Sequence, residues 1–508
     1  MEATTSDSIS SVKKRLKLST RCKDEDRISN LPSALLHYVL SFLDMKYVVK
    51  TCVLSRRWRD VWMSVPNLKF DYQFHSKSGG KGDEFVDFVD QVLLLRSTDS
   101  NIQELSLRVR DIENVSLMNT WIRFAVKHNV QVLDVNITRQ VVRRQELPLH
   151  VSGLESLRVL KLTHDFFSPT VDLTLPHSVI LPRLKVLQLS AIRFSNEKLM
   201  AELLSNCPVL ETLVLKRCGF WNMKNVVISG GQLKNLVIEH CRNEYHSSDL
   251  NVMVSASSLE SFSCKDLERN EFSLDKFPSL VDADIDIAIQ NIEADSSYDI
   301  DDYCRMKDRF GYRMVNIFNG LSCVRVLTLS AWSVQFLSEV LDTVEDLLNT
   351  FHNLRYLKVT AFCTSSSIRS VIRLLKSLPN LETFKMRINE RCCKEVRYYI
   401  CPLKKLRSKH HNKLLEEELL SPSVLRQLKS IEIRELLGCK DEINFVKFVL
   451  KNAVKLEKLV IIVADRLIKE AWTKEFHDRL LKFPRASSSI SVFLSFEEIR
   501  KPQSNSEY

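Results

Sequence analysis

The hydrophobic residues between positions 102 and 461 repeat in one pattern, apolar-x-x-apolar-x-apolar. Alternation of apolar and polar residues at the end of each motif predicts a short strand with one face in the core. The first intervals between motifs are 28, 27, 27, 26, 23 and 26 residues, which is enough for one strand and its return. The motif begins at Ile102, Val130, Leu157, Leu184, Leu210, Leu233, Leu259, Leu280, Val324, Leu354, Leu381, Leu428 and Leu456.

These repeats predict an α/β fold, a leucine-rich repeat solenoid in which short parallel strands and helices stack into a horseshoe. No single unit can bury its own apolar face, so the units share one continuous core. The return is expected to be a helix or an extended turn. Between Ser195 and Pro208 a one-sided stripe of Leu199, Leu203 and Leu204 predicts a helix capped by Ser195. Two double-length intervals, 280–324 and 381–428, predict insertions or degenerate units.

Residues 27–70 change from the strand period to a helical period. Apolar residues recur three and four apart after Pro32, then in a second short run, and Trp58 and Trp62 share a face of a third helix. So small a unit carries more large apolar side chains than it can bury alone, which indicates a partner or a neighbouring domain. A plain helical cap for the solenoid is the less favoured alternative that the pattern leaves open.

The same segment resembles an F-box, particularly in DRISNLP and VLSRRWRDVW. It departs from the family at Ser33-Ala34 and at Asp44-Met45, neither of which removes an apolar anchor. The resemblance implies docking to an SKP-type adaptor, which links to cullin and RING subunits. By position, the implied adaptor-binding residues are Leu31, Pro32, Leu35, Leu36 and Leu40, with Val53, Leu54 and Trp58 packing the helices together or completing that surface.

Beyond residue 70 the chain resembles the plant F-box/leucine-rich repeat proteins, and LKSIEIRELLG, FVKFVLKNAVKLEKLVI and FPRASSSISVFL resemble the FBD domain that ends many of them. The resemblance implies six segments along the chain, and the F-box is expected to contain three helices. The segments are a disordered basic tail 1–26, the F-box 27–70, a helical linker 71–101, repeats 102–420, the FBD domain 421–496 and a tail 497–508.

The resemblance implies a non-catalytic, substrate-recognising subunit of an SCF-type ubiquitin ligase, whose repeats bind an unknown target protein. The alternative is a protein-binding repeat scaffold without a ligase link. Alternate strand residues are expected to face the concave side and to contact the target. The candidates are Lys161, Gln188, Lys216, Tyr356, Lys358, Lys385 and Arg387.

The composition of the chain argues against several other functions. The net charge is +10 with 73 basic and 63 acidic residues, whose interspersion favours a solvated surface over a nucleic-acid site. Ten glycines in 508 residues leave little for phosphate-binding loops or nucleophile elbows, and no catalytic residue set and no cofactor are expected. Thirteen cysteines without an apolar leader or membrane-spanning run predict a nuclear or cytoplasmic, non-secreted protein with free thiols.

Three groups of cysteine or acidic residues have side chains that could bind a metal ion. Cys218 and Cys241, three residues after the last apolar position of their motifs, are predicted to be packing residues. The acidic run 282–302 lacks the features of a calcium loop and predicts a solvated, partly disordered insertion. Cys392, Cys393, Cys401, His410 and His411 have ligand chemistry but not zinc-knuckle spacing, so no metal site is expected.

Overall fold

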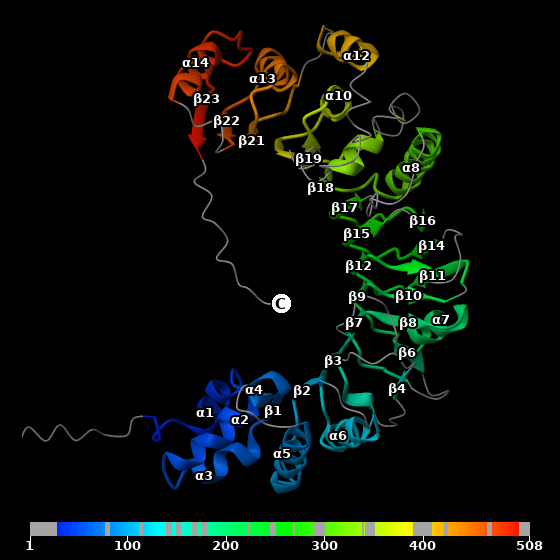
Figure 1. Ribbon diagram of the computed structural model, residues 1–508, viewed down its shortest axis with the longest axis vertical. Helices are drawn as coiled ribbons and strands as arrows, with labels where there is room; N and C mark the ends of the chain where they lie inside the picture. Colours follow the sequence, from blue (N-terminus) through cyan, green and yellow to red (C-terminus); the bar gives the residue numbers. More distant parts are fainter. Residues whose placement is uncertain are drawn as a thin grey trace, which may run out of the picture.

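The structure, a computed structural model, is a C-shaped arc whose inner face is one parallel sheet (Figure 1). It describes residues 28–76, 82–110, 115–138, 145–148, 154–164, 171–174, 180–221, 223–243, 250–267, 270–288, 300–337, 340, 351–389, 409–420, 425–464 and 470–496. Helices line the outside of the arc, with the F-box segment at one tip and the C-terminal helices at the other.

The sheet has 15 strands in the order β1-β2-β3-β5-β7-β9-β12-β15-β17-β18-β19-β20-β21-β22-β23. Their bounds are β1 Asn67–Asp71, β2 Glu104–Arg110, β3 Val132–Thr138, β5 Val159–His164, β7 Val186–Ser190, β9 Thr212–Lys216, β12 Asn235–Glu239, β15 Ser261–Leu267, β17 Asp282–Ala288, β18 Val326–Leu329, β19 Tyr356–Phe362, β20 Thr383–Asn389, β21 Ser430–Leu436, β22 Lys458–Val463 and β23 Ser491–Phe496.

All thirteen predicted motifs form strands of this sheet, and each strand begins two residues after the motif does. The last two apolar residues of each motif point into the core, as Leu160 and Leu162 do, because successive strand residues face opposite sides. Two end strands were not predicted. β1 contains the motif at Val65 within the F-box segment, and the position equivalent to its first apolar residue is Ser489 before β23.

The convex side combines helices with two small parallel sheets in the early repeats. One sheet runs β13-β10-β8-β6-β4 and the other β11-β14-β16. Their bounds are β4 Gln145–Pro148, β6 Val171–Thr174, β8 Ile192–Phe194, β10 Gly219–Phe220, β11 Asn225–Ser229, β13 Arg242–Asn243, β14 Leu250–Ser255 and β16 Asn270–Leu274. In these repeats the return is therefore mostly the extended form. Cys218 and Cys241 are buried beside them, and their thiols donate to Leu189 O and Leu215 O at 3.5 Å, so their predicted packing role is confirmed.

Most helices after the F-box lie on the outer side of the sheet (Figure 1), and the helix Lys409–Leu420 packs on the helix Ser365–Ser377 and not on the sheet. Their bounds are α4 Tyr72–Ser76, α5 Gly82–Leu95, α6 Val115–Lys127, η3 Leu154–Ser156, α7 Glu197–Ser205, α8 Ile300–Gly320, α10 Ser365–Ser377, α12 Lys409–Leu420, α13 Lys440–Asn452 and α14 Glu470–Leu481. The predicted helix before Pro208 is α7, but its N-cap is Asn196, whose side chain accepts from Leu199 N at 3.0 Å, and not Ser195.

The two predicted insertions contain regular structure. Residues 282–288 of the acidic run form β17, a central strand, so the expectation of a solvated insertion is wrong there. The apolar residues Ala283, Ile285 and Ile287 alternate with the acids and are buried, which outweighs the local like-charge repulsion. Residues 289–299 lie outside the described residues, as do 390–408 with Cys392, Cys393 and Cys401, and nothing is described of the side chains of His410 and His411.

Candidate partner-binding surfaces

The F-box segment folds as three short helices, as predicted, each ending in or followed by a tight turn. They are α1 Ser33–Leu40, α2 Met45–Lys50 continued by η1 Thr51–Val53, and α3 Trp58–Val61 continued by η2 Trp62–Ser64. Pro32 is the N-cap of α1, and the Asp44 carboxylate caps α2 by accepting from Lys46 N at 2.8 Å.

Many large apolar side chains are exposed on these helices, although other apolar residues of the same helices are buried in the core. Val53 is 83% exposed, Phe42 68% and Leu54 63%. We call this set the F-box apolar surface: Ile28, Leu35, Tyr38, Val39, Phe42, Leu43, Tyr47, Val53 and Leu54. A contiguous sequence segment that leaves so many large apolar side chains in water is typical of a protein–protein interface.

A buried layer beneath this surface holds the helices together. Leu36, Met45 and Val48 are fully buried, and Trp58 is 4% exposed. The Trp58 indole donates to Ser29 Oγ at 2.8 Å, and the Arg57 guanidinium donates to the carbonyls of Ser29 and Leu31. These contacts tie the segment preceding α1 to α3, so Ser29 and Leu31 are held in place beside the third helix.

The F-box helices are joined to the repeats by buried polar contacts as well as by the sheet. The Asp44 carboxylate that caps α2 also accepts from Asp71 N in β1 at 2.8 Å, and β1 pairs with β2. Arg96, 5% exposed, donates to Val65 O at 2.6 Å and to Asn101 O at 3.1 Å. Burial lowers the pKa of Arg96 to about 10, so it remains charged at neutral pH. The apolar surface and the repeat sheet therefore form one packed body.

The predicted adaptor-binding residues divide between surface and core. Leu35, Val53 and Leu54 are exposed, as is Pro32, and Leu31 is half-buried. The side chains of Leu36, Leu40 and Trp58 are buried within the free chain, where they support the surface from beneath, and their adaptor-binding role stays a prediction. Trp58 packs between the helices, and whether it also completes the adaptor-binding surface stays a prediction.

Several exposed members of the surface were not among the predicted docking residues. Ile28, Tyr38, Val39, Phe42 and Tyr47 belong to it. Tyr38 and Phe42 form an edge-to-face pair with ring centroids 5.1 Å apart. A signal was present in the sequence, because α1 carries apolar residues on both of its faces and only one face can turn inward.

The concave face of the sheet is the second candidate surface. The registered pairs join the third residue of every strand into one row. From β1 to β23 the row is Lys69, Ser106, Asp134, Lys161, Gln188, Val214, Val237, Ser263, Asp284, Thr328, Lys358, Lys385, Glu432, Val460 and Phe493. All seven predicted target-contacting residues lie in this row or in the rows on either side of it.

The character of this face changes along the arc. Valine is the first residue of β3, β5 and β7, and it is the third residue of β9 and β12. β17 contributes three carboxylates, Asp282, Asp284 and Asp286, and burial raises the pKa of Asp282 and Asp284. β19 to β21 then contribute the basic residues Lys358, Lys385, Arg387 and Arg434.

Cross-strand ion pairs engage three of the predicted target-contacting residues. Lys216 Nζ lies 2.8 Å from Glu239 Oε2, Lys385 Nζ lies 3.1 Å from Glu432 Oε2, and Arg387 pairs with Glu435. Hydrogen bonding to Glu432 raises the pKa of Lys385, whose ammonium also lies 5.8 Å from the centroid of the Tyr356 ring. These pairs organise the face, and each of the three basic side chains would need to exchange or share its partner to contact a target.

Within the described residues, the helices are too short or too polar to cross a membrane.

Sequence comparisons agree with this arrangement in three separate stretches. The family profile of the F-box domain matches residues 28–70, that of "FBD-associated F-box protein At5g56370, LRR repeats" matches residues 118–275, and that of FBD matches residues 421–461. The last match falls on β21, α13 and the start of β22, so the FBD region continues the repeat sheet.

Relatives from Arabidopsis thaliana match the chain over almost its whole length. F-box/FBD/LRR-repeat protein At5g53840 is 26% identical over 489 residues, 94% of this chain and 97% of its own length. F-box/LRR-repeat protein 13 is 29% identical over 480 residues, 92% of this chain and 96% of its own length. The chain therefore combines an F-box, leucine-rich repeats and an FBD region, and its relatives are F-box/FBD/LRR-repeat proteins of Arabidopsis thaliana.

Proposed function

We propose that this protein is the substrate-recognising subunit of an SCF-type ubiquitin ligase. The F-box docks an SKP-type adaptor, through it a cullin and a RING subunit, and the repeats bind a target protein for ubiquitination. The protein itself supplies no catalytic group and needs no cofactor for this role, and it acts in the nucleus or the cytoplasm.

The observation that carries the proposal is the F-box apolar surface. Full burial of a side chain of the size of valine or leucine stabilises a complex by about 1.5–3 kcal/mol relative to exposure. Nine such side chains in residues 28–54 are exposed in this chain, whereas the neighbouring Leu36 and Leu40 are buried. A segment that folds and still keeps one apolar face in water is best explained by a partner that covers this face.

The rigid arc supports the second half of the proposal. One hydrophobic core runs from Leu36 to Leu480, and the F-box helices share it with the repeats. A target held on the concave face would therefore keep a fixed position relative to the adaptor. Position matters in ubiquitin transfer because the acceptor lysine must reach the active site of an enzyme that another subunit carries.

The rows of the concave face suggest how a target would be held. Lys161 and Gln188 lie beside the valine-lined part, and Lys358, Lys385 and Arg387 form a basic part with Tyr356 next to them. A mixed apolar and basic surface is suited to a protein segment with apolar and acidic side chains. Lys216 lies between these parts and next to Glu239.

A pull-down of the full chain with a recombinant SKP-type adaptor tests the docking step. The wild type should retain the adaptor, and Leu31→Ala combined with Pro32→Ala should retain much less, because both residues directly precede α1, which carries Leu35, Tyr38 and Val39 of the surface. Failure of the wild type to bind would refute the ligase role and favour the alternative, a repeat scaffold without a ligase link.

Co-purification from plant cells with the proteasome blocked tests the target step. A target of a ubiquitin ligase should accumulate on the wild-type protein and carry ubiquitin. If bound proteins are recovered in equal amount without proteasome inhibition and without ubiquitin, the scaffold function is the correct one.

A further inference from the structure

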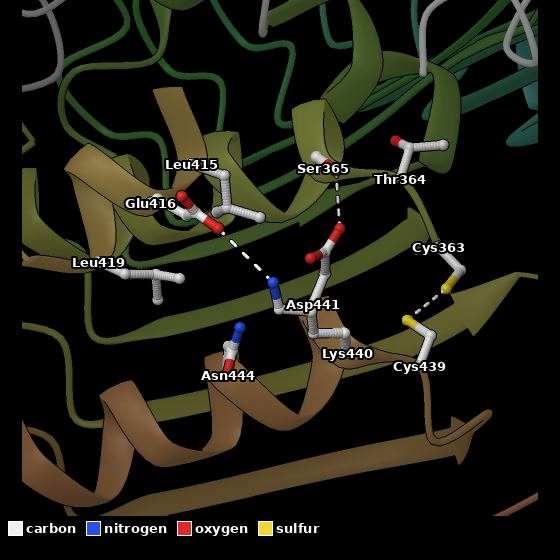
Figure 2. A pocket seen from close by; sticks show the side chains of 10 residues that line it. All are labelled: Cys363, Thr364, Ser365, Leu415, Glu416, Leu419, Cys439, Lys440, Asp441 and Asn444. Carbon is white, nitrogen blue, oxygen red and sulfur yellow. Dashed lines mark hydrogen bonds and ion pairs between the residues drawn. The ribbon is translucent and has the colours of Figure 1, made fainter. Parts of the chain in front are cut away.

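Two cysteines and a glutamate meet where the repeats join the FBD region. Cys363 follows β19 and precedes the N-cap of α10, and Cys439 is the N-cap of α13. The two residues are 76 positions apart in the sequence, yet their Sγ atoms lie 2.8 Å from each other (Figure 2). A carboxylate oxygen of Glu442 completes a set of three donor atoms that all lie within 4.8 Å of one another.

The carboxylate of Glu442 is buried and only half of it is satisfied. The residue is 1% exposed, and its Oε2 accepts from Leu437 N at 2.9 Å and from Cys439 N at 3.3 Å. Its Oε1 is buried and has no hydrogen-bond partner of normal geometry among the described residues. A buried carboxylate oxygen without such a partner costs free energy, which a cation or a proton would recover.

We propose that Cys363, Cys439 and Glu442 bind a thiophilic divalent cation of the zinc class. Two sulfur donors exclude calcium and magnesium, which take oxygen ligands, and one carboxylate beside two thiolates suits tetrahedral zinc. Zn–S bonds of about 2.3 Å place two sulfur ligands about 3.7 Å apart, so the two Sγ atoms separate by about 1 Å on binding.

The surroundings allow both this movement and a fourth ligand. Cys439 follows Gly438, which has a φ of 72°, at the start of a helix, and Cys363 lies in the connection between a strand and a helix. Both cysteines line a pocket of about 340 Å³ (Figure 2), through which a water molecule can reach the fourth position. On the pocket wall, Ser365 Oγ donates to Asp441 Oδ2 at 2.6 Å and Lys440 Nζ lies 3.5 Å from Glu416 Oε1.

The binding step balances without an oxidant. A divalent cation replaces the two thiol protons, which pass to solvent, and the ionised Glu442 supplies the third bond; a protonated Glu442 would release one proton more. The cation would join the connection after β19 to the start of α13. It would thus fasten the FBD region to the repeats across the second insertion, independently of the proposed ligase role.

Metal analysis of the full-length chain, purified under reducing conditions, tests the site with zinc itself as the probe. We expect one equivalent of zinc, and with cobalt a thiolate-to-cobalt charge-transfer band. Cys363→Ser and Cys439→Ser should each lose the band, and Glu442→Gln should weaken zinc binding by about tenfold or more. Serine and glutamine keep the cap of α13, so these variants should match the metal-free wild type in thermal stability.

Two controls separate this site from other thiols. Cys323→Ser changes a half-buried thiol elsewhere in the repeats and should leave the zinc content unchanged. The triple variant Cys392→Ser, Cys393→Ser, Cys401→Ser removes the other cysteine cluster and should also retain zinc. Loss of zinc in this triple variant but not in Cys363→Ser would overturn the proposal. So would a wild type that binds no zinc, or one whose two thiols are found joined as a disulfide when purified under reducing conditions.

Discussion

The F-box apolar surface leads to a quantitative prediction for Val53 and Leu54. Val53 is 83% and Leu54 63% exposed in the free chain, so each can bury most of its side chain against an adaptor. At about 0.8 kcal/mol per buried CH₂, and scaled by these exposed fractions, alanine at both positions should cost about 3 kcal/mol of binding free energy. This corresponds to an increase in Kd of about 100-fold.

Titration calorimetry or biolayer interferometry with a purified SKP-type adaptor measures this change. Thermal unfolding of the double variant should differ little from the wild type, because both side chains are already in water. Leu420→Ala combined with Val454→Ala provides the matched control, since these residues are 81% and 44% exposed near the opposite tip of the arc. An unchanged Kd in the Val53→Ala, Leu54→Ala variant, or an equal loss in the control, would refute the assignment of the surface.

Three further predictions concern stability. Leu36→Ala should lower the free energy of unfolding by about 2–5 kcal/mol in denaturant titrations, since Leu36 is fully buried, whereas the neighbouring Leu35→Ala should change it by less than about 1 kcal/mol. Burial lowers the pKa of His75 below 6.5. The stability that neutral His75 contributes is therefore present above that pH and is lost as pH falls through the folded-state pKa. His75→Gln should reduce the loss of stability between about pH 7 and about pH 5, and an unchanged loss would contradict the argument. Burial and two acidic neighbours on β17 raise the pKa of Asp284, so its contribution to the stability of the fold falls as pH rises through that pKa. Asp284→Asn should therefore stabilise the protein at neutral pH by about 0.2–1 kcal/mol. Calorimetric scans in which the variant unfolds at a lower temperature would disprove this.

The strands of the sheet could be predicted from the sequence because each strand has its own local alternation of apolar and polar residues. The alternation in a motif such as Leu157, Leu160 and Leu162 depends only on which side of one strand faces the core. Residues 282–288 show that this signature outranks charge, since three aspartates did not prevent a central strand. The end strands were missed for local reasons, Val65 because its motif overlaps the F-box and Ser489 because it replaces an apolar residue.

The F-box apolar surface could be predicted only in part from the sequence, because α1 has apolar residues on both sides. Periodicity groups Leu36 with Leu40 but does not say that this face turns inward while Leu35 and Val39 remain outside. That choice depends on how α1 packs against Trp58 in α3, which no local pattern encodes. Short helices are the hardest case, since two turns contain too few residues to define one apolar stripe.

Contacts between residues that are far apart in the sequence could not be predicted from it. The pairing of Lys385 with Glu432 requires the register of β20 with β21 across an interval of 47 residues. The approach of Cys363 to Cys439 likewise depends on the stacking of whole repeats. Sequence spacing instead drew attention to Cys392, Cys393 and Cys401, which are close in the chain and lie outside the described residues.

Hydrogen–deuterium exchange of the full chain with and without a purified SKP-type adaptor tests the central claim most directly. The account predicts that the adaptor slows exchange in residues 28–54 and leaves the strands of the concave face unchanged. Protection confined to the concave face, or no protection in a mixture at concentrations that saturate related F-box proteins, would contradict it.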